Sequence, residues 1–120
     1  MRVDYDEALA RNRFDLLHEG GELVALIETL AERGQFLIVN VAVAPAHQKR
    51  GLGRRLLAHA ETLAGEAGYR EIRLYTYSLM TENIALYERL GYRIDRQEPV
   101  GTSVQVHMSK RLAPPDQTPR

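Results

Sequence analysis

The sequence predicts a single α/β domain built on a mixed sheet, and three neighbouring segments carry this prediction. Residues 36–43 are a nearly continuous run of apolar and β-branched side chains, which is typical of a central strand covered on both faces. Residues 52–67 place apolar side chains at helical spacing before Gly68, which is expected to end the helix, and residues 71–77 alternate in polarity. This order predicts a right-handed βαβ unit with two parallel strands.

The residues that precede this unit predict antiparallel strands. Apolar runs at 14–17 and 23–30 flank the pair Gly20-Gly21. Such a pair favours a tight hairpin turn, because glycine adopts positive φ without strain. Residues 31–34 predict a second turn, which leads into the central strand.

The residues that follow the unit predict a short helix and a final hairpin. Thr81 is expected to cap this helix at its start, and Gly91 is expected to end it. Strands are expected at 92–96 and 104–110. The loop between them contains Pro99 and a nearby glycine, residue types that favour turns.

The two ends of the chain predict less regular structure. Residues 5–13 are charged, with a few apolar side chains at helical spacing, so a brief amphipathic helix is expected there. Residues 113–120 contain two consecutive prolines and no apolar periodicity. We therefore expect a disordered tail after one domain that spans residues 1–112.

Composition narrows the possible functions. The 120 residues include 16 basic and 16 acidic side chains, so the net charge gives no general attraction for nucleic acid or anionic lipid. The chain has no cysteine, which excludes disulfides and thiolate metal sites, and its histidines lack metal-ligand spacing. No apolar leader is evident, and no run reaches the ~18 residues of a membrane span. We expect a soluble cytoplasmic protein that binds no metal, membrane or nucleic acid.

Residues 48–53, Gln-Lys-Arg-Gly-Leu-Gly, join the central strand to the helix and suggest an anion site. Glycines let a backbone approach a ligand, the start of a helix leaves amide donors unpaired, and basic side chains add charge. The amides of residues 49–54 would converge on a diphosphate. Alternatively, Gly51 and Gly53 only permit the turn into the helix. The P-loop motif is absent, and Leu56 stands where a dinucleotide-binding motif needs its third glycine.

Two motifs resemble those of the GNAT superfamily, the acyl-CoA-dependent N-acyltransferases. One is a loop of the form [RQ]-x-x-G-x-[GA] after a strand. The other is a helix with an asparagine and a tyrosine near its start and the ending L-G-[YF]. The matching residues are Gln48, Gly51, Gly53, Asn83, Tyr87 and Leu90-Gly91-Tyr92. The resemblance covers residues 14–112, and the family has the same order of strands and helices that the periodicity predicts.

The resemblance implies a V-shaped gap between strands 36–43 and 71–77 that holds the pantetheine arm of acetyl-CoA. Main-chain groups of the first strand would pair with this arm, the glycine loop would bind the pyrophosphate, and an asparagine would bind the arm near the thioester. The cofactor-binding residues implied in this way are Val41, Ala42, Val43, Gln48, Lys49, Arg50, Gly51, Leu52, Gly53, Arg54, Asn83 and Tyr87.

The resemblance also implies an N-acetyltransferase, in which a primary amine of a small molecule or peptide attacks the thioester of acetyl-CoA in a ternary complex. Tyr87 would be the catalytic residue that assists departure of the thiolate. Because a phenol has a pKa of ~10 and a thiol of ~8.5, full proton transfer is uphill by about 2 kcal/mol. A hydrogen bond from Tyr87 would then be its contribution. Alternatively, Tyr87 is an aromatic side chain of the core.

The base that deprotonates the amine is not evident, because strand 36–43 carries Asn40 and no carboxylate. Glu28, His47 and Tyr75 are candidates by approximate position only, and residues at such positions are more often ordinary strand-edge, loop or cleft-lining residues. A relay through water would also serve. Without a base, the domain could instead bind acyl-CoA as a non-catalytic sensor or interaction module.

Only one short predicted helix precedes residue 14, whereas most relatives begin with a helix and a first strand. If that pair is missing, the edge of strand 14–17 is exposed, and unpaired strand edges invite pairing with a second chain. We therefore expect a homodimer. Alternatively, this sequence is a shortened form of a longer protein, and its acceptor pocket is incomplete.

Overall fold

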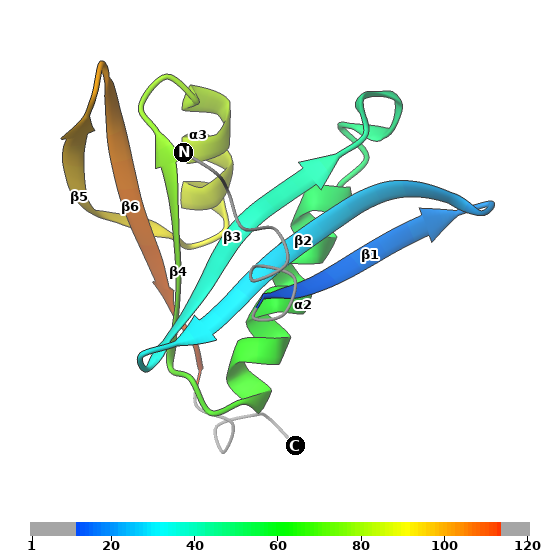
Figure 1. Cartoon of the computed structure of the whole chain (residues 1–120), viewed down its shortest axis with the longest axis horizontal. Coiled ribbons are helices and arrows are strands. Elements are labelled where there is room, and N and C mark those ends of the chain that lie inside the picture. The colour runs from blue at the N-terminus through cyan, green and yellow to red at the C-terminus, as the bar shows by residue number, and fades with distance from the viewer. Residues whose placement is uncertain (1–11, 114–120) are drawn as a thin grey trace, which may run out of the picture.

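The computed structural model describes residues 12–113, which form one mixed sheet with helices packed on it (Figure 1). The elements in chain order are β1 (Arg13–Glu19), β2 (Glu22–Glu32), β3 (Gln35–Val43), the 3₁₀ helix η1 (Pro45–His47), α2 (Leu52–Glu66), β4 (Glu71–Tyr77), α3 (Thr81–Arg89), β5 (Arg93–Val100) and β6 (Ser103–Arg111). The strands lie in the order β1-β2-β3-β4-β6-β5. The predicted α/β class, βαβ unit and final hairpin are confirmed.

Tight turns join the first three strands: the first at the predicted glycine pair and the second at residues 33–34, within the predicted turn 31–34. Gly20 and Gly21 have φ of +58° and +82°, and Arg33 and Gly34 repeat the pattern at +54° and +74°. Two consecutive residues with positive φ match the right-handed twist of a hairpin. These strands therefore form an antiparallel meander, with β1 at one edge of the sheet.

The parallel strands β3 and β4 run side by side for only a short distance. Their pairing consists of Leu37 with Arg73 and Ile38 with Leu74. Beyond these pairs the two strands diverge towards their carboxyl ends (Figure 1). The sheet therefore contains the V-shaped opening that the family resemblance implied.

A β-bulge lies in β3 at the point of divergence. Thr29 of β2 pairs with Ile38, whereas the preceding residue, Glu28, pairs with Asn40. Val39 is the extra residue between these pairs. A bulge bends its strand and increases the local twist, which is the change of direction that carries β3 away from β4.

The bulge also changes which side chains of β3 face the helices. Phe36 and Ile38 are buried before the bulge, whereas Val41 and Val43 pack against the core after it. In an uninterrupted strand, residues of one face alternate with period two, so the even-numbered residues would have kept this orientation. The extra residue thus turns Val41 and Val43 towards the helices.

The hydrophobic core lies on one face of the sheet. α2 buries a stripe of leucines and alanines there, and Ile84, Tyr87 and Leu90, at the second helix, pack at its margin. Ile27 and Ile72 are among the most deeply buried side chains. Neither helix of the described chain is long and apolar enough to cross a membrane.

The opposite face of the sheet is less covered by the described residues. Leu37 and Val39 are only partly buried, and Tyr75 and Tyr77 are each 40% exposed. The expectation that the central strand is covered on both faces is therefore wrong for residues 12–113. The reason is that both helices pack on the same side.

Other local predictions were also wrong. Thr81 is the first residue of α3 rather than its cap, and Met80, in the cap position, makes no side-chain capping hydrogen bond. Pro99 lies within β5, opposite Val104, rather than in a loop. β5 is an edge strand, where the missing amide of a proline can face away from the ladder. The 3₁₀ helix η1 was not predicted.

The predictions for the chain ends lie almost wholly outside the described residues. These are the short helix over 5–13 and the disordered tail over 113–120. The structure describes Arg13, which opens β1 instead of ending a helix.

Replacement of Leu74 by alanine tests the assigned core. Leu74 is 3% exposed, whereas Leu79, in the loop after β4, is 86% exposed. We expect Leu74→Ala to lower the free energy of unfolding by about 2–5 kcal/mol, because a buried leucine leaves a cavity. The matched control Leu79→Ala should change it by less than about 0.5 kcal/mol. Urea unfolding followed by circular dichroism measures both, and equal losses would contradict the core assignment.

Candidate functional site

A cleft of about 620 Å³ lies between the diverged end of β3, the start of α2 and one face of α3. Residues of the glycine loop and residues of the second helix both line it. The lining residues are Val41, Val43, His47, Gln48, Lys49, Gly51, Leu52, Gly53, Arg54, Leu57, Glu82, Asn83, Leu86, Tyr87 and Arg89.

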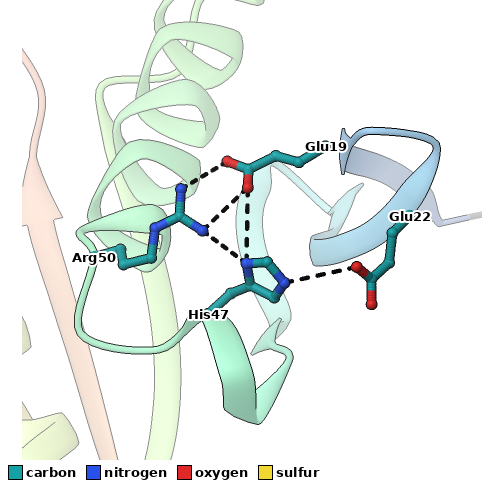
Figure 2. A network of polar contacts seen from close by, with 4 residues as sticks. All are labelled: Glu19, Glu22, His47 and Arg50. Atoms are coloured by element: carbon teal, nitrogen blue, oxygen red, sulfur yellow. Dashed lines mark hydrogen bonds and ion pairs between the residues drawn. The ribbon is translucent and has the colours of Figure 1, made fainter.

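The cleft brings together all but two of the residues expected to bind the cofactor. The exceptions are Ala42 and Arg50. Ala42 is exposed and follows Val41 in the strand, so the alternation of side chains turns it to the other face. Arg50 lies in the loop, but its guanidinium group bonds to Glu19 at the β1–β2 turn (Figure 2).

The glycine loop has a backbone that few sequences could adopt. Gly51, the cap residue of α2, has φ of +82°, and Lys49 has φ of +65°. Lysine is strained in this left-handed region, whereas glycine is not. The Gln48 side chain holds the loop to the sheet, because its amide nitrogen donates to the carbonyl oxygen of Val43 at 3.1 Å.

Main-chain donors of the loop are available to a ligand. The first amide of α2 with a helical acceptor is that of Arg55, which donates to the carbonyl of Gly51 at 3.0 Å. Within residues 12–113, no hydrogen bond takes up the amides of residues 49–54. A row of free donors at a helix start binds an anion, and each hydrogen bond to a charged group contributes about 1.5–3 kcal/mol.

Cationic side chains surround these donors. Lys49 and Arg54 line the cleft beside the loop, and Arg89 lines it from α3. None of the three forms an ion pair with another described residue. Glu82 is the acidic residue of the lining, so positive charge prevails in the cleft. The arrangement suits a ligand with more than one phosphate group.

Asn83 and Tyr87 lie one turn apart on the face of α3 that lines the cleft. Both are partly buried, and within the described chain neither side chain forms a hydrogen bond. The Tyr87 hydroxyl is thus a free donor. Burial raises its pKa above the ordinary value for tyrosine, so it stays protonated at neutral pH.

The buried side chain of Tyr92 supports the ring of Tyr87. The ring of Tyr92 lies against it, with centroids 6.0 Å apart. The Tyr92 hydroxyl donates to Glu61 at 3.0 Å, and the same carboxylate accepts a hydrogen bond from Lys110 at 2.9 Å. Burial and the adjacent Glu61 carboxylate raise the pKa of Tyr92, which keeps this donor protonated. Tyr87 thus packs against a side chain that is itself fixed.

The structure brings only one of the three candidate bases to the cleft. His47 is among the lining residues, but its Nδ1 atom lies 2.7 Å from a nitrogen of Arg50. Glu28 accepts a hydrogen bond from Asn12 at 2.6 Å and is not part of the lining. Tyr75 is 40% exposed and its ring lies 6.0 Å from that of His107, also outside the lining.

Sequence reasoning missed several lining residues. Leu57 follows Gly53 by one helical turn, and Leu86 follows Asn83 by three residues. Glu82 and Arg89 are seven residues apart on the same helix. Helical spacing from the motif residues would have identified Leu57 and Leu86, because positions i+3 and i+4 share one face. Glu82 and Arg89 lie four and three residues from Leu86, so they follow only once Leu86 is placed in the cleft.

Comparison with known proteins gives a consistent result. The family model described as "Acetyltransferase (GNAT) domain" matches residues 10–94. The chain is 33% identical over 90 residues to an uncharacterized N-acetyltransferase, YvbK, of Bacillus subtilis, covering 74% of this chain and 58% of that protein. It is 33% identical over 76 residues to the [ribosomal protein bS18]-alanine N-acetyltransferase of Escherichia coli K12, covering 63% and 51%. The chain thus spans about half the length of these curated relatives.

Solved structures share the fold. The ribosomal-protein-S18-alanine N-acetyltransferase of Escherichia coli has a TM-score of 0.80 at 22% identity, over 100% of this chain and 84% of that chain. A GNAT family acetyltransferase from Elizabethkingia anophelis, solved with acetyl-CoA bound, has a TM-score of 0.78 at 19% identity, over 90% and 81%. The family model matches well over half of the sequence, and the topology agrees with it. This chain belongs to the GNAT family of acetyltransferases.

Proposed function

We propose that this protein binds acetyl-CoA in the cleft and transfers the acetyl group to a primary amine. One observation carries the proposal: the same cleft holds a row of free loop amides at one end and a free tyrosine hydroxyl at the other. The first feature suits a diphosphate, and the second suits a leaving thiolate. When bound, acetyl-CoA supplies an acetyl group already activated as a thioester.

The residues divide into two groups by the part of the cofactor that they would hold. The amides of residues 49–54, with Lys49 and Arg54, would bind the pyrophosphate. Main-chain groups of Val41 and Val43 would meet the pantetheine arm, because no strand of residues 12–113 pairs with β3 on its β4 side beyond Ile38. Asn83 would bind this arm through its side-chain amide.

In the transfer step, the nitrogen of the amine forms a bond to the acetyl carbon, the carbon–sulfur bond breaks and CoA leaves as a thiolate. The proton that the amine loses would pass to water. A main-chain amide of β3 near Val41 would stabilise the charge that develops on the carbonyl oxygen. Tyr87 would donate a hydrogen bond to the departing sulfur. Because burial raises the pKa of Tyr87, full transfer of its proton is less favourable than a hydrogen bond.

The preferred acceptor in this proposal is an α-amine of a peptide or small molecule. The Escherichia coli relative is named for transfer to an alanine of a ribosomal protein. No carboxylate of β3 lines the cleft, so an acceptor that needs little help to lose its proton is favoured. At pH 7 about a tenth of an α-amine of pKa ~8 is uncharged, against less than about a thousandth of a lysine side chain.

Replacement of Tyr87 by phenylalanine tests the transfer step. We expect kcat to fall by about 10–100-fold, which corresponds to loss of one hydrogen bond to a developing charge. The Kd for acetyl-CoA should stay within about threefold. Release of free thiol in the presence of an amine panel gives the rate, and calorimetry gives Kd. The control is Tyr69→Phe, because Tyr69 packs on Phe36 and lies outside the cleft lining.

The same assay separates the enzyme from a non-catalytic acyl-CoA sensor, which the lack of an evident base would favour. A sensor would bind acetyl-CoA yet release no thiol with any amine. A Tyr87→Phe variant with wild-type kcat would also contradict the proposed role of this residue.

Replacement of Gly51 by glutamate tests the placement of the pyrophosphate. We expect acetyl-CoA binding to weaken at least about tenfold, because the change strains a left-handed residue and adds negative charge beside the donors. Gly101→Glu is the matched control, since Gly101 also has positive φ, at +60°, and lies outside the cleft lining. Normal binding by Gly51→Glu would show that the phosphates bind elsewhere.

We also propose a homodimer formed through β1. This strand lies at the edge of the sheet, and its Leu16 side chain is 52% exposed and that of Phe14 36%. Exposed strand edges with apolar side chains favour pairing between chains. Sedimentation at tens of micromolar should give twice the monomer mass, and Leu16→Lys should shift the equilibrium towards monomer. A wild-type monomer at that concentration would exclude the dimer.

A further inference from the structure

An ion pair joins the β1–β2 turn to the glycine loop (Figure 2). The two terminal nitrogens of Arg50 donate to the two carboxylate oxygens of Glu19, each at 3.0 Å. The partners are 31 residues apart in the chain. A guanidinium and a carboxylate matched in this bidentate way are fixed in direction as well as distance.

His47 and Glu22 extend this contact into a group of four, which we call the hairpin clamp: Glu19, Glu22, His47 and Arg50. The Nδ1 atom of His47 lies 2.7 Å from Arg50 and 3.7 Å from Glu19. Its Nε2 atom lies 3.8 Å from Glu22. Figure 2 shows the imidazole between the two glutamates, with the arginine beside it. Both ends of the hairpin turn therefore contact residues of the loop region.

The loop needs external support. Its backbone passes through a left-handed lysine, Lys49, which is an unfavourable conformation for a side chain of that size. On the side of β3, Gln48 bonds to the Val43 carbonyl at 3.1 Å. On the opposite side of Lys49, Arg50 is held by Glu19 of the hairpin clamp. The strained residue thus lies between two anchored side chains.

We propose that Glu19 is a positioning residue for the cofactor loop: it holds Arg50 so that the amides of residues 49–54 stay directed into the cleft before acetyl-CoA arrives. This inference rests on the proposed function. Preorganised donors bind a ligand more tightly because less conformational freedom is lost on binding. Arg50 hydrogen-bonds Glu19 and lowers its pKa, so the carboxylate remains charged at neutral pH.

A competing explanation makes the opposite prediction. If the guanidinium of Arg50 were a phosphate ligand, Glu19 would compete with the cofactor for it, and removal of Glu19 would tighten binding. If Glu19 instead positions Arg50, removal of Glu19 loosens the loop and weakens binding of acetyl-CoA. The sign of the change in Kd therefore separates the two explanations.

The first test is Glu19→Gln, measured as Kd for acetyl-CoA by calorimetry and as KM and kcat by thiol release. We expect Kd and KM to rise about 3–10-fold with kcat within about twofold, because the loop and not the reacting groups is disturbed. The matched control is Glu98→Gln on β5, whose carboxylate contacts Arg96 at 3.0 Å and His107 at 2.9 Å outside the cleft. The control should leave all three constants unchanged.

The second test is a double-mutant cycle with Arg50→Gln. If Glu19 acts through Arg50, the double variant should bind acetyl-CoA no more weakly than either single variant. Additive losses would overturn the proposal, as would tighter or unchanged binding by Glu19→Gln. Equal urea midpoints among the variants would show that the effect is not general unfolding.

A third measurement needs no cofactor. In the free protein, Glu19→Gln should lower the backbone NMR order parameters of residues 49–51, whereas Glu98→Gln should not. Unchanged order parameters would overturn the proposal that Glu19 restrains the loop. If the wild-type protein fails to bind acetyl-CoA while the order parameters respond as expected, the proposed function is wrong and the clamp stands as a restraint on the loop.

Discussion

The separation of β3 from β4 is the constraint on which the rest of the site depends. Two parallel strands that stayed paired would satisfy their main-chain groups with each other and leave no space between them. Here one extra residue, Val39, redirects β3 after Ile38. The bulge opens the cleft, leaves β3 without a described strand partner on its β4 side, and turns Val41 and Val43 inwards. A single local irregularity therefore produces three features of the site.

The cleft is chemically different at its two ends, because main-chain groups line one end and polar side chains line the other. At the loop, donors come from the main chain and depend on backbone shape, so the sequence there is constrained by φ at Lys49 and Gly51. At α3, the polar groups are the side chains of Asn83 and Tyr87, and the ring of Tyr87 packs against Tyr92. Because different elements form the two ends, the proposed binding and transfer roles can be tested by separate substitutions.

Much of the fold could be predicted from periodicity, because apolar side chains recur about every 3.6 residues in its helices and every two residues in its strands. The site could be predicted where a motif names residues close in sequence, as at Gly51 and Gly53. It could not be predicted where a contact joins distant segments. Nothing near Arg50 in the sequence indicates Glu19, which a hairpin turn brings to it. Likewise, alternation counted from Phe36 would turn Val41 away from the core, and only the bulge reverses this.

The proline in β5 has a consequence for how sheets of this protein can join. The sheet has two edges, β1 and β5. Pro99 offers no amide donor, and charged residues fill much of the rest of β5, so this edge is a poor template for another strand. Within the described sheet, β1 is then the edge that favours strand addition. In the proposed dimer, two copies that meet there through a twofold axis would each use the receptive edge of the sheet formed by residues 12–113, so that association would close at two.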